Sequence, residues 1–160
     1  MIKLEDVFHV GFTGTRRGMS LEQKTVVGNI LCRIRDQNKT QTLHHGCCVG
    51  ADVEAHMIAY DMGFKIHLHP PLDTSYECDD LKILSQAFEV DPPYSYSGRN
   101  QRIVLRSNLV IATPLSLNGK GGTWNCLGHA DDINKPRIII IPDGRTINYG
   151  VVPYNLEFKQ

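Results

Sequence analysis

The sequence predicts a Rossmann-like α/β fold, in which a mainly parallel β-sheet forms the middle layer of a three-layer sandwich between helices. Short apolar runs alternate with segments of helical periodicity along the whole chain. Three of these apolar runs end in glycine-rich loops. The length of 160 residues, with 41% hydrophobic and 21% charged residues, suits one domain that buries its own core. We therefore expect residues 1–160 to form a single domain.

The first half of the chain contains three strand patterns separated by two helices. Ser20 and Gln23 have the spacing of a capping box and predict the start of a helix that ends near Asp36. A second helix is expected from about Asp52, with Gly63 at the position that follows its C-cap. The strands are expected at residues 7–12, 42–45 and 65–69.

The second half begins with an irregular connection at residues 72–97, which contains Pro92-Pro93 and several tyrosines. We expect one short helix in it, around residues 80–88, and a role as a lid over the site or as a partner surface. An edge hairpin is expected beyond Asp143-Gly144. The remaining elements are expected as helices at 99–106 and 123–134 and strands at 109–112 and 137–141.

The three glycine-rich loops are the candidate binding elements, because open parallel sheets bind ligands at the carboxyl ends of their strands. Residues 11–18 offer two threonine hydroxyls and two guanidinium groups, or form a flexible surface loop. Residues 45–52 place Asp52 at a helix start, where it caps the helix, holds a ribose hydroxyl, or does both. Residues 118–122, followed by Thr123, form either a phosphate cradle or a tight turn. The first loop is neither a Walker A motif nor a GxGxxG fingerprint.

Four segments in this order resemble the SLOG superfamily of Rossmann-like domains, over roughly residues 7–142. They are Gly-Phe-Thr-Gly-Thr-Arg from Gly11, His-Gly-Cys-Cys-Val-Gly-Ala-Asp from His45, Arg-Asn at Arg99, and Gly-Gly-Thr from Gly121. The superfamily includes a bacterial DNA-processing protein, the Lonely Guy phosphoribohydrolases, and sensing domains that respond to cyclic ADP-ribose-type signals.

The resemblance implies a nucleotide-derived small-molecule ligand: a nucleotide, ADP-ribose or a cyclic ADP-ribose-like signal. It also implies a contact for Arg99, which otherwise fits a solvated helix start. The chain would sense such a signal or sequester it, as a phage counter-defence protein would. The expected ligand-binding residues are Thr13, Gly14, Thr15, Arg16, Gly46, Asp52, Arg99, Asn100, Gly121, Gly122 and Thr123.

One departure from the family pattern argues against catalysis. The Lonely Guy enzymes carry a glutamate in Gly-Gly-x-Gly-Thr-x-x-Glu, and Cys126 stands at that position here. A neutral thiol does not replace a carboxylate in cleaving a glycosidic bond. Asn100 also stands where those enzymes have a lysine. The alternative is a nucleotide N-glycosidic-bond hydrolase that uses a non-standard carboxylate, such as Glu54 or Glu89.

Composition and charge limit the other classes of function. Seventeen basic and 17 acidic residues give a net charge of zero, which argues against a salt-driven grip on duplex DNA. Single-stranded nucleic acid is a third alternative and would need a basic groove with stacking aromatics. The first six residues lack a signal-peptide pattern, and the longest apolar run, 138–141, is too short to cross a bilayer. We expect a cytoplasmic homo-oligomer, in a bacterium or a phage-infected cell, without disulfides.

No cofactor and no metal are assigned from the sequence. His44 and His45 end one predicted strand, and His67 and His69 end another. Alternation along a strand places His67 and His69 on one face. No carboxylate or cysteine stands at a convincing ligand spacing, so hydrogen bonds to loops explain them. The aromatic residues expected either to stack on a base or to pack are Tyr76, Tyr94, Tyr96 and Trp124.

Overall fold

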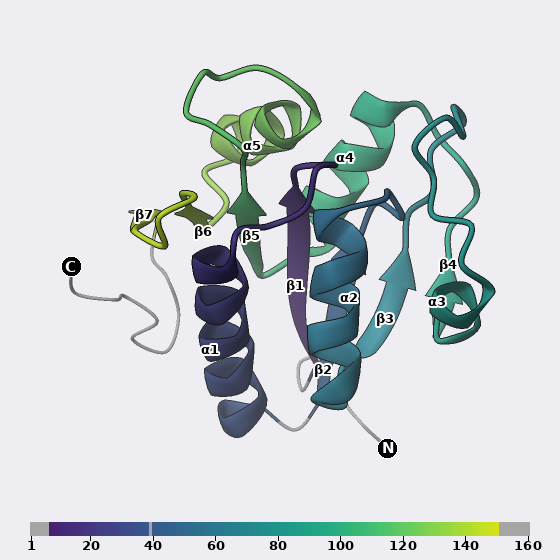
Figure 1. The fold of residues 1–160 in the computed structure, drawn as a ribbon, viewed down its shortest axis with the longest axis horizontal. Coiled ribbons are helices and arrows are strands. Elements are labelled where there is room, and N and C mark those ends of the chain that lie inside the picture. Colours follow the sequence, from purple (N-terminus) through teal and green to yellow (C-terminus); the bar gives the residue numbers. More distant parts are fainter. Residues whose placement is uncertain (1–6, 39, 151–160) are drawn as a thin grey trace.

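The computed structural model describes residues 7–38 and 40–150 and shows a seven-stranded sheet with helices on both faces (Figure 1). The strand order is β4-β3-β2-β1-β5-β6-β7, and only the β6–β7 pair is antiparallel. The predicted α/β class with a mainly parallel sheet is confirmed. The strands are β1 (Val7–Gly14), β2 (Thr40–His45), β3 (Lys65–Leu68), β4 (Glu89–Val90), β5 (Leu109–Thr113), β6 (Arg137–Ile140) and β7 (Thr146–Tyr149). The N-terminal segment behind the signal-peptide argument and the last ten residues lie outside the described range.

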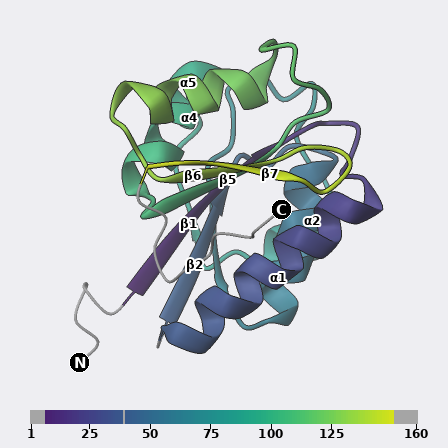
Figure 2. The same ribbon diagram turned by 90° about the vertical axis from the view of Figure 1, so that its left-hand side faces the viewer.

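The helices form the two outer layers of the sandwich. The pair α1 (Leu21–Gln37) and α2 (Ala51–Asp61) covers one face, and α4 (Tyr96–Arg106) and α5 (Gly122–Asp132) cover the other (Figure 2). The short α3 (Leu81–Ser85) lies near β4 at the edge of the sheet (Figure 1). Within the described residues no helix combines the length and apolarity that crossing a membrane requires.

The capping box predicted for α1 is present and also links the helix to the sheet. The Ser20 side chain accepts from the Gln23 amide at 3.0 Å, and the Gln23 side chain accepts from the Ser20 amide. The buried side-chain amide of Gln23 also donates, through Nε2, to the carbonyls of Pro114 and Ile140, at 3.0 and 2.9 Å. One polar side chain therefore fixes the start of α1 against the ends of two strands.

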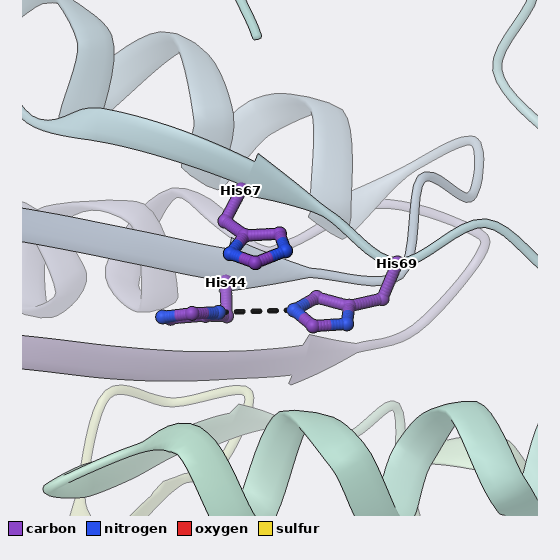
Figure 3. Close-up of side chains that lie close together, drawn as sticks. All are labelled: His44, His67 and His69. Carbon is purple, nitrogen blue, oxygen red and sulfur yellow. Dashed lines mark hydrogen bonds between the residues drawn. The ribbon is translucent and has the colours of Figure 1, made fainter. Parts of the chain in front are cut away.

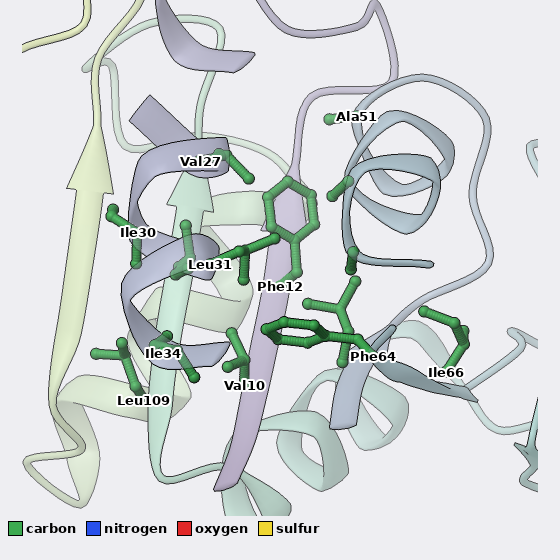
Figure 4. Close-up of a cluster of buried hydrophobic side chains, with 14 of the residues drawn as sticks. Val10, Phe12, Val27, Ile30, Leu31, Ile34, Ala51, Phe64, Ile66 and Leu109 are labelled. Atoms are coloured by element: carbon green, nitrogen blue, oxygen red, sulfur yellow. The ribbon is translucent and has the colours of Figure 1, made fainter. Parts of the chain in front are cut away.

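The main apolar core lies between the sheet and the α1/α2 layer (Figure 4). Val10 and Phe12 point into this core from β1, and Leu31 and Ile34 meet them from α1. Burial of each such side chain contributes about 1.5–3 kcal/mol. Gly11 faces the opposite layer, where an added Cβ would lie 3.1 Å from Ile103 of α4. Helix α4 can therefore pack closely against the sheet only because residue 11 has no side chain.

The structure differs from the expected elements in two places. The edge strand β4 was not predicted, because two residues are too few to show alternation. Helix α4 begins at Tyr96 rather than at Arg99, since the Ser95 hydroxyl accepts from the Gly98 amide at 3.2 Å and caps the helix earlier. The edge hairpin is confirmed by the β6–β7 pair.

Substitution of Gly50 tests how closely the first loop packs against the start of α2. Its φ of +87° and a Cβ position 2.5 Å from the Arg16 carbonyl carbon make Gly50→Ala strained. We expect it to lower the free energy of unfolding by about 2 kcal/mol or more. Urea denaturation measures the change. The matched variant Gly128→Ala, in α5 with open space around it, should instead gain about 0.5–1 kcal/mol. Equal effects of the two variants would contradict the packing described here.

Candidate ligand-binding pocket

The three glycine-rich loops meet around one cavity of about 620 Å³ at the carboxyl ends of β1, β2 and β5. This volume lies within the range of small-molecule sites. All eleven residues expected to bind ligand line the cavity. Parallel strands bring their carboxyl ends to one edge of the sheet, which is why residues so distant in sequence meet there. Their binding role stays a prediction.

The lining of the cavity is strongly cationic although the chain as a whole is neutral. Four lining side chains are basic and a single one, Asp52, is acidic. A concave site with an excess of one charge attracts ligands of the opposite charge. The pocket is therefore suited to an anionic ligand. The basic residues are Arg16, Arg17, Arg99 and Lys120.

The third loop ends in an open helix start. Gly121, with φ of +99°, is the N-cap of α5, and no side chain caps the helix. The first amides of a helix have no acceptor within it and carry partial positive charge. The Asn100 side chain donates to the Gly122 carbonyl at 3.3 Å and to Asn125 Oδ1 at 3.0 Å, which fixes this turn. The uncapped start of α5 thus lies in the cavity lining, at residues 121–123.

The backbone amides of the second loop donate hydrogen bonds to other groups of the protein. The Ala51 amide donates to the Thr15 carbonyl at 3.0 Å, and the Cys48 amide donates to Asp52 Oδ2 at 3.2 Å. Asp52 was expected as the N-cap of α2, and this is wrong: Gly50 is the N-cap, and Asp52 closes the loop from inside the helix. Burial raises the pKa of Asp52 to about 6, against the opposing effects of Arg99 and the backbone amides of Cys48 and Gly46.

Arg99 lines the cavity but is also an internal tie. Its guanidinium Nη1 donates to the Gly46 carbonyl at the end of β2, and to the His69 carbonyl after β3 at 3.4 Å. A Cβ at residue 46 would overlap this guanidinium, which explains the glycine. Arg99 Nε has no hydrogen-bond partner among the described residues. The side chain therefore both shapes the pocket and keeps one donor nitrogen unused.

The irregular connection, expected as a lid over the site or as a partner surface, supplies part of the cavity wall at residues 96 and 97. Tyr96 and Ser97 line it, and the Arg16 Cζ lies 3.8 Å from the ring centroid of Tyr76 and 5.6 Å from that of Tyr96. Trp124 also lines the cavity and donates from Nε1 to the Ser116 carbonyl at 3.1 Å. Tyr96 and Trp124 are among the aromatic residues expected to stack on a base or to pack.

The carboxylates considered for hydrolysis lie elsewhere. Glu54 accepts from the Met19 amide at 2.6 Å and pairs with Lys24 at 2.7 Å, and Glu89 belongs to the edge strand. Neither lines the cavity. Cys126, at the position of the family glutamate, is fully buried, and burial raises the pKa of its thiol to about 12. It therefore remains protonated at neutral pH.

The strand-end histidines have a carboxylate partner after all. Asp91 Oδ1 lies 2.7 Å from His67 Nε2, and Asp91 Oδ2 lies 3.0 Å from His69 Nδ1. No carboxylate stands at a convincing ligand spacing in the sequence, and β4 nevertheless places Asp91 beside β3 through the strand register. Burial lowers the pKa of His44 to about 2 and that of His69 to about 3, so both rings are neutral at pH 7.

Comparison with known proteins identifies the fold. No protein-family model and no curated protein matches the chain in sequence. Among solved structures, the molybdenum cofactor binding protein of Rippkaea orientalis superposes with a TM-score of 0.62 at 20% identity, over 84% of this chain and 76% of that one. DNA processing protein A of Streptococcus pneumoniae gives 0.65 at 18% identity, over 83% and 50%. The chain therefore has the Rossmann-like α/β fold of these proteins, as the sequence predicted.

A third structure of the same fold is the molybdenum cofactor carrier protein of Chlamydomonas reinhardtii. It superposes with a TM-score of 0.57 at 17% identity, over 82% of this chain and 75% of that one. DNA processing protein A of Helicobacter pylori, which binds single-stranded DNA, superposes with a TM-score of 0.61 at 21% identity, over 82% of this chain and 64% of that one. Proteins of this fold thus bind ligands as different as a cofactor and a nucleic acid.

The raised pKa of Asp52 should make the stability of the fold depend on pH. Its folded pKa of about 6 exceeds the value of 3.8 in an unfolded chain, so folding takes up a proton between these two pH values. Wild-type protein should therefore gain about 1 kcal/mol relative to Asp52→Asn on acidification from pH 8 to pH 5. Denaturant unfolding of both proteins at each pH measures this, and the contributions of all other groups cancel in the difference. A difference that does not vary with pH would contradict the raised pKa.

Substitution of Arg99 tests whether this residue stabilises the fold or only binds ligand. Arg99→Gln leaves the carbonyls of Gly46 and His69 without their donor and should cost about 2–4 kcal/mol without any ligand. Arg17→Gln, at an exposed cation of the same pocket, should change stability by less than about 0.5 kcal/mol. Thermal or urea unfolding compares them. An unaltered stability of Arg99→Gln would refute the internal tie.

Proposed function

We propose that this chain binds a nucleotide-derived small molecule, such as a nucleotide, ADP-ribose or a cyclic ADP-ribose-like signal, and holds it without cleaving it. The observation that carries the proposal is the uncapped start of α5, which opens into a cavity lined by four basic side chains and one acidic one. Helix starts of this kind bind phosphate through their amides. Lys120, Arg16 and Arg17 add positive charge from the flanking loops.

The rest of the lining suits the other parts of a nucleotide. The partly buried rings of Tyr96 and Trp124 offer faces for stacking a base. Asp52 and the hydroxyls of Thr13 and Thr15 offer partners for ribose hydroxyls. A cavity of about 620 Å³ has room for a nucleotide with more than one phosphate.

The absence of turnover is supported by the position of the acidic groups. Cys126 replaces the family glutamate as a buried, protonated thiol, and Glu54 and Glu89 lie outside the cavity lining. Asp52, the single carboxylate among the lining residues, already accepts from the backbone of its own loop. A domain of this kind would sense its ligand or sequester it.

Thermal shift tests the proposal on the full chain with AMP, ADP, ADP-ribose, cyclic ADP-ribose isomers, inorganic phosphate and a single-stranded oligonucleotide. A ligand at about 100 times its Kd stabilises the fold by about 2.7 kcal/mol, which corresponds to a rise in Tm on the order of 5–10 °C. Mass spectrometry then identifies the recovered ligand. Intact ligand supports holding, and free base with ribose phosphate would establish hydrolysis instead. A shift with the oligonucleotide alone would favour the nucleic-acid class.

A pair of lysine variants locates the binding. Lys120→Ala removes an exposed cation of the cavity lining and should weaken ligand binding by about tenfold, the loss of one charge-assisted contact. Lys82→Ala removes an exposed cation of α3, outside the lining, and should leave affinity unchanged. Isothermal titration compares the two. Equal affinities would place the ligand elsewhere.

A further inference from the structure

A second polar cluster lies outside the cavity lining. The imidazoles of His44, His67 and His69 are buried together at the ends of β2 and β3, with exposed fractions of 1%, 3% and 1% (Figure 3). His44 and His67 are direct neighbours in the sheet register, and His44 is also paired with Gly11, which faces α4. The three rings therefore occupy the face of the sheet opposite the main apolar core. Buried parallel strands normally carry aliphatic residues at such positions.

We propose that His44, His67 and His69 form a binding site for a divalent transition-metal ion of the Zn²⁺ type. One ring nitrogen from each histidine lies within 4.8 Å of the other two. Figure 3 shows His44 and His69 pointing toward each other, with Nδ1 of His44 2.9 Å from Nε2 of His69. Bonds of about 2.0–2.1 Å to a tetrahedral Zn²⁺ would place two ligand nitrogens roughly 3.3 Å apart. Small ring rotations therefore convert this contact into a pair of metal bonds.

The surrounding groups are arranged as they are around metal-bound histidines, whose second nitrogen is held by a carboxylate or another polar group. His44 uses Nε2 to contact His9 Nδ1 at 2.8 Å, which leaves Nδ1 for the ion. His69 directs Nδ1 toward Asp91 Oδ2 at 3.0 Å, which leaves Nε2 for the ion. Asp91 also lies 2.7 Å from His67 Nε2 and supplies negative charge beside the site.

A hydrogen-bonded network without metal explains the cluster less completely. His69 Nδ1 lies at ion-pair distance from Asp91 but outside hydrogen-bond geometry, and it is a buried nitrogen without a hydrogen-bond partner among the described residues. Leaving such a polar atom unsatisfied in the interior is costly. Binding of an ion through Nε2 would hold the ring and strengthen Nδ1–H as a donor to Asp91.

Cobalt binding tests the proposal on the tag-free full chain after treatment with a chelator. We expect one equivalent of Co²⁺ to give the visible absorption of a nitrogen-bound site, without thiolate charge-transfer bands, and Zn²⁺ to displace it. Charge-transfer bands would assign the ion to the cysteines instead, of which Cys47, Cys48, Cys78 and Cys126 are buried. No binding of either ion would overturn the site.

Matched variants locate the ion. His44→Gln and His69→Gln should each lower Co²⁺ affinity by at least about 100-fold, and Asp91→Asn, which alters only the orienting carboxylate, by about 10–100-fold. The control His56→Gln removes another histidine contact, to His45 and Gln86 on α2's side of the sheet, and should leave affinity unchanged. Unaltered affinity in both His44→Gln and His69→Gln would refute the proposal.

One measurement needs no variant and therefore does not depend on mutant folding. Anomalous diffraction at the zinc edge, from wild-type crystals grown with Zn²⁺, should show a peak between the three imidazoles. A peak elsewhere, or none, would overturn the assignment. Nucleotide binding at the cationic pocket is measured separately, because the three histidines do not line it.

Discussion

The buried guanidinium of Arg99 is the contact on which the geometry of the site depends. It reaches from α4 to the carbonyl that ends β2 and to the carbonyl that follows β3, and it occupies the space that a side chain at Gly46 would need. A buried charge persists only where acceptors and an opposite charge compensate it. The Gly46 and His69 carbonyls supply the acceptors, and Asp52 supplies the charge. This contact therefore fixes α4 against the ends of β2 and β3 beside the pocket.

The two faces of the sheet differ in the side chains that they carry. The α1/α2 face carries the continuous aliphatic core, which stabilises the fold (Figure 4). The opposite face carries the close approach of α4 at Gly11 and, beyond it, the histidine cluster. His69 belongs to both polar systems, since its carbonyl accepts from Arg99 and its ring contacts His44. The cationic pocket and the proposed metal site are thus neighbours joined through one residue.

Local sequence signals were sufficient for most of the framework. The capping box at Ser20 and Gln23 set the start of α1, and the positive φ of Gly63 set the end of α2. The glycine-rich loops identified the pocket because the carboxyl ends of parallel strands necessarily share one edge of the sheet. The same signals failed for β4, which is too short for a period, and for the start of α4, where Ser95 was not recognised as a cap.

The sequence alone predicted the order of the strands and helices apart from β4, the mainly parallel sheet and eleven of the residues that line the pocket. The tertiary structure decided what several of those residues do. Asp52 closes its own loop rather than capping the helix, and Arg99 ties strand ends together. Asp91 meets His67 and His69. The physical reason is that periodicity and capping act over a few residues, whereas the contacts of Arg99 and Asp91 join segments 20 or more positions apart and depend on strand register and helix packing.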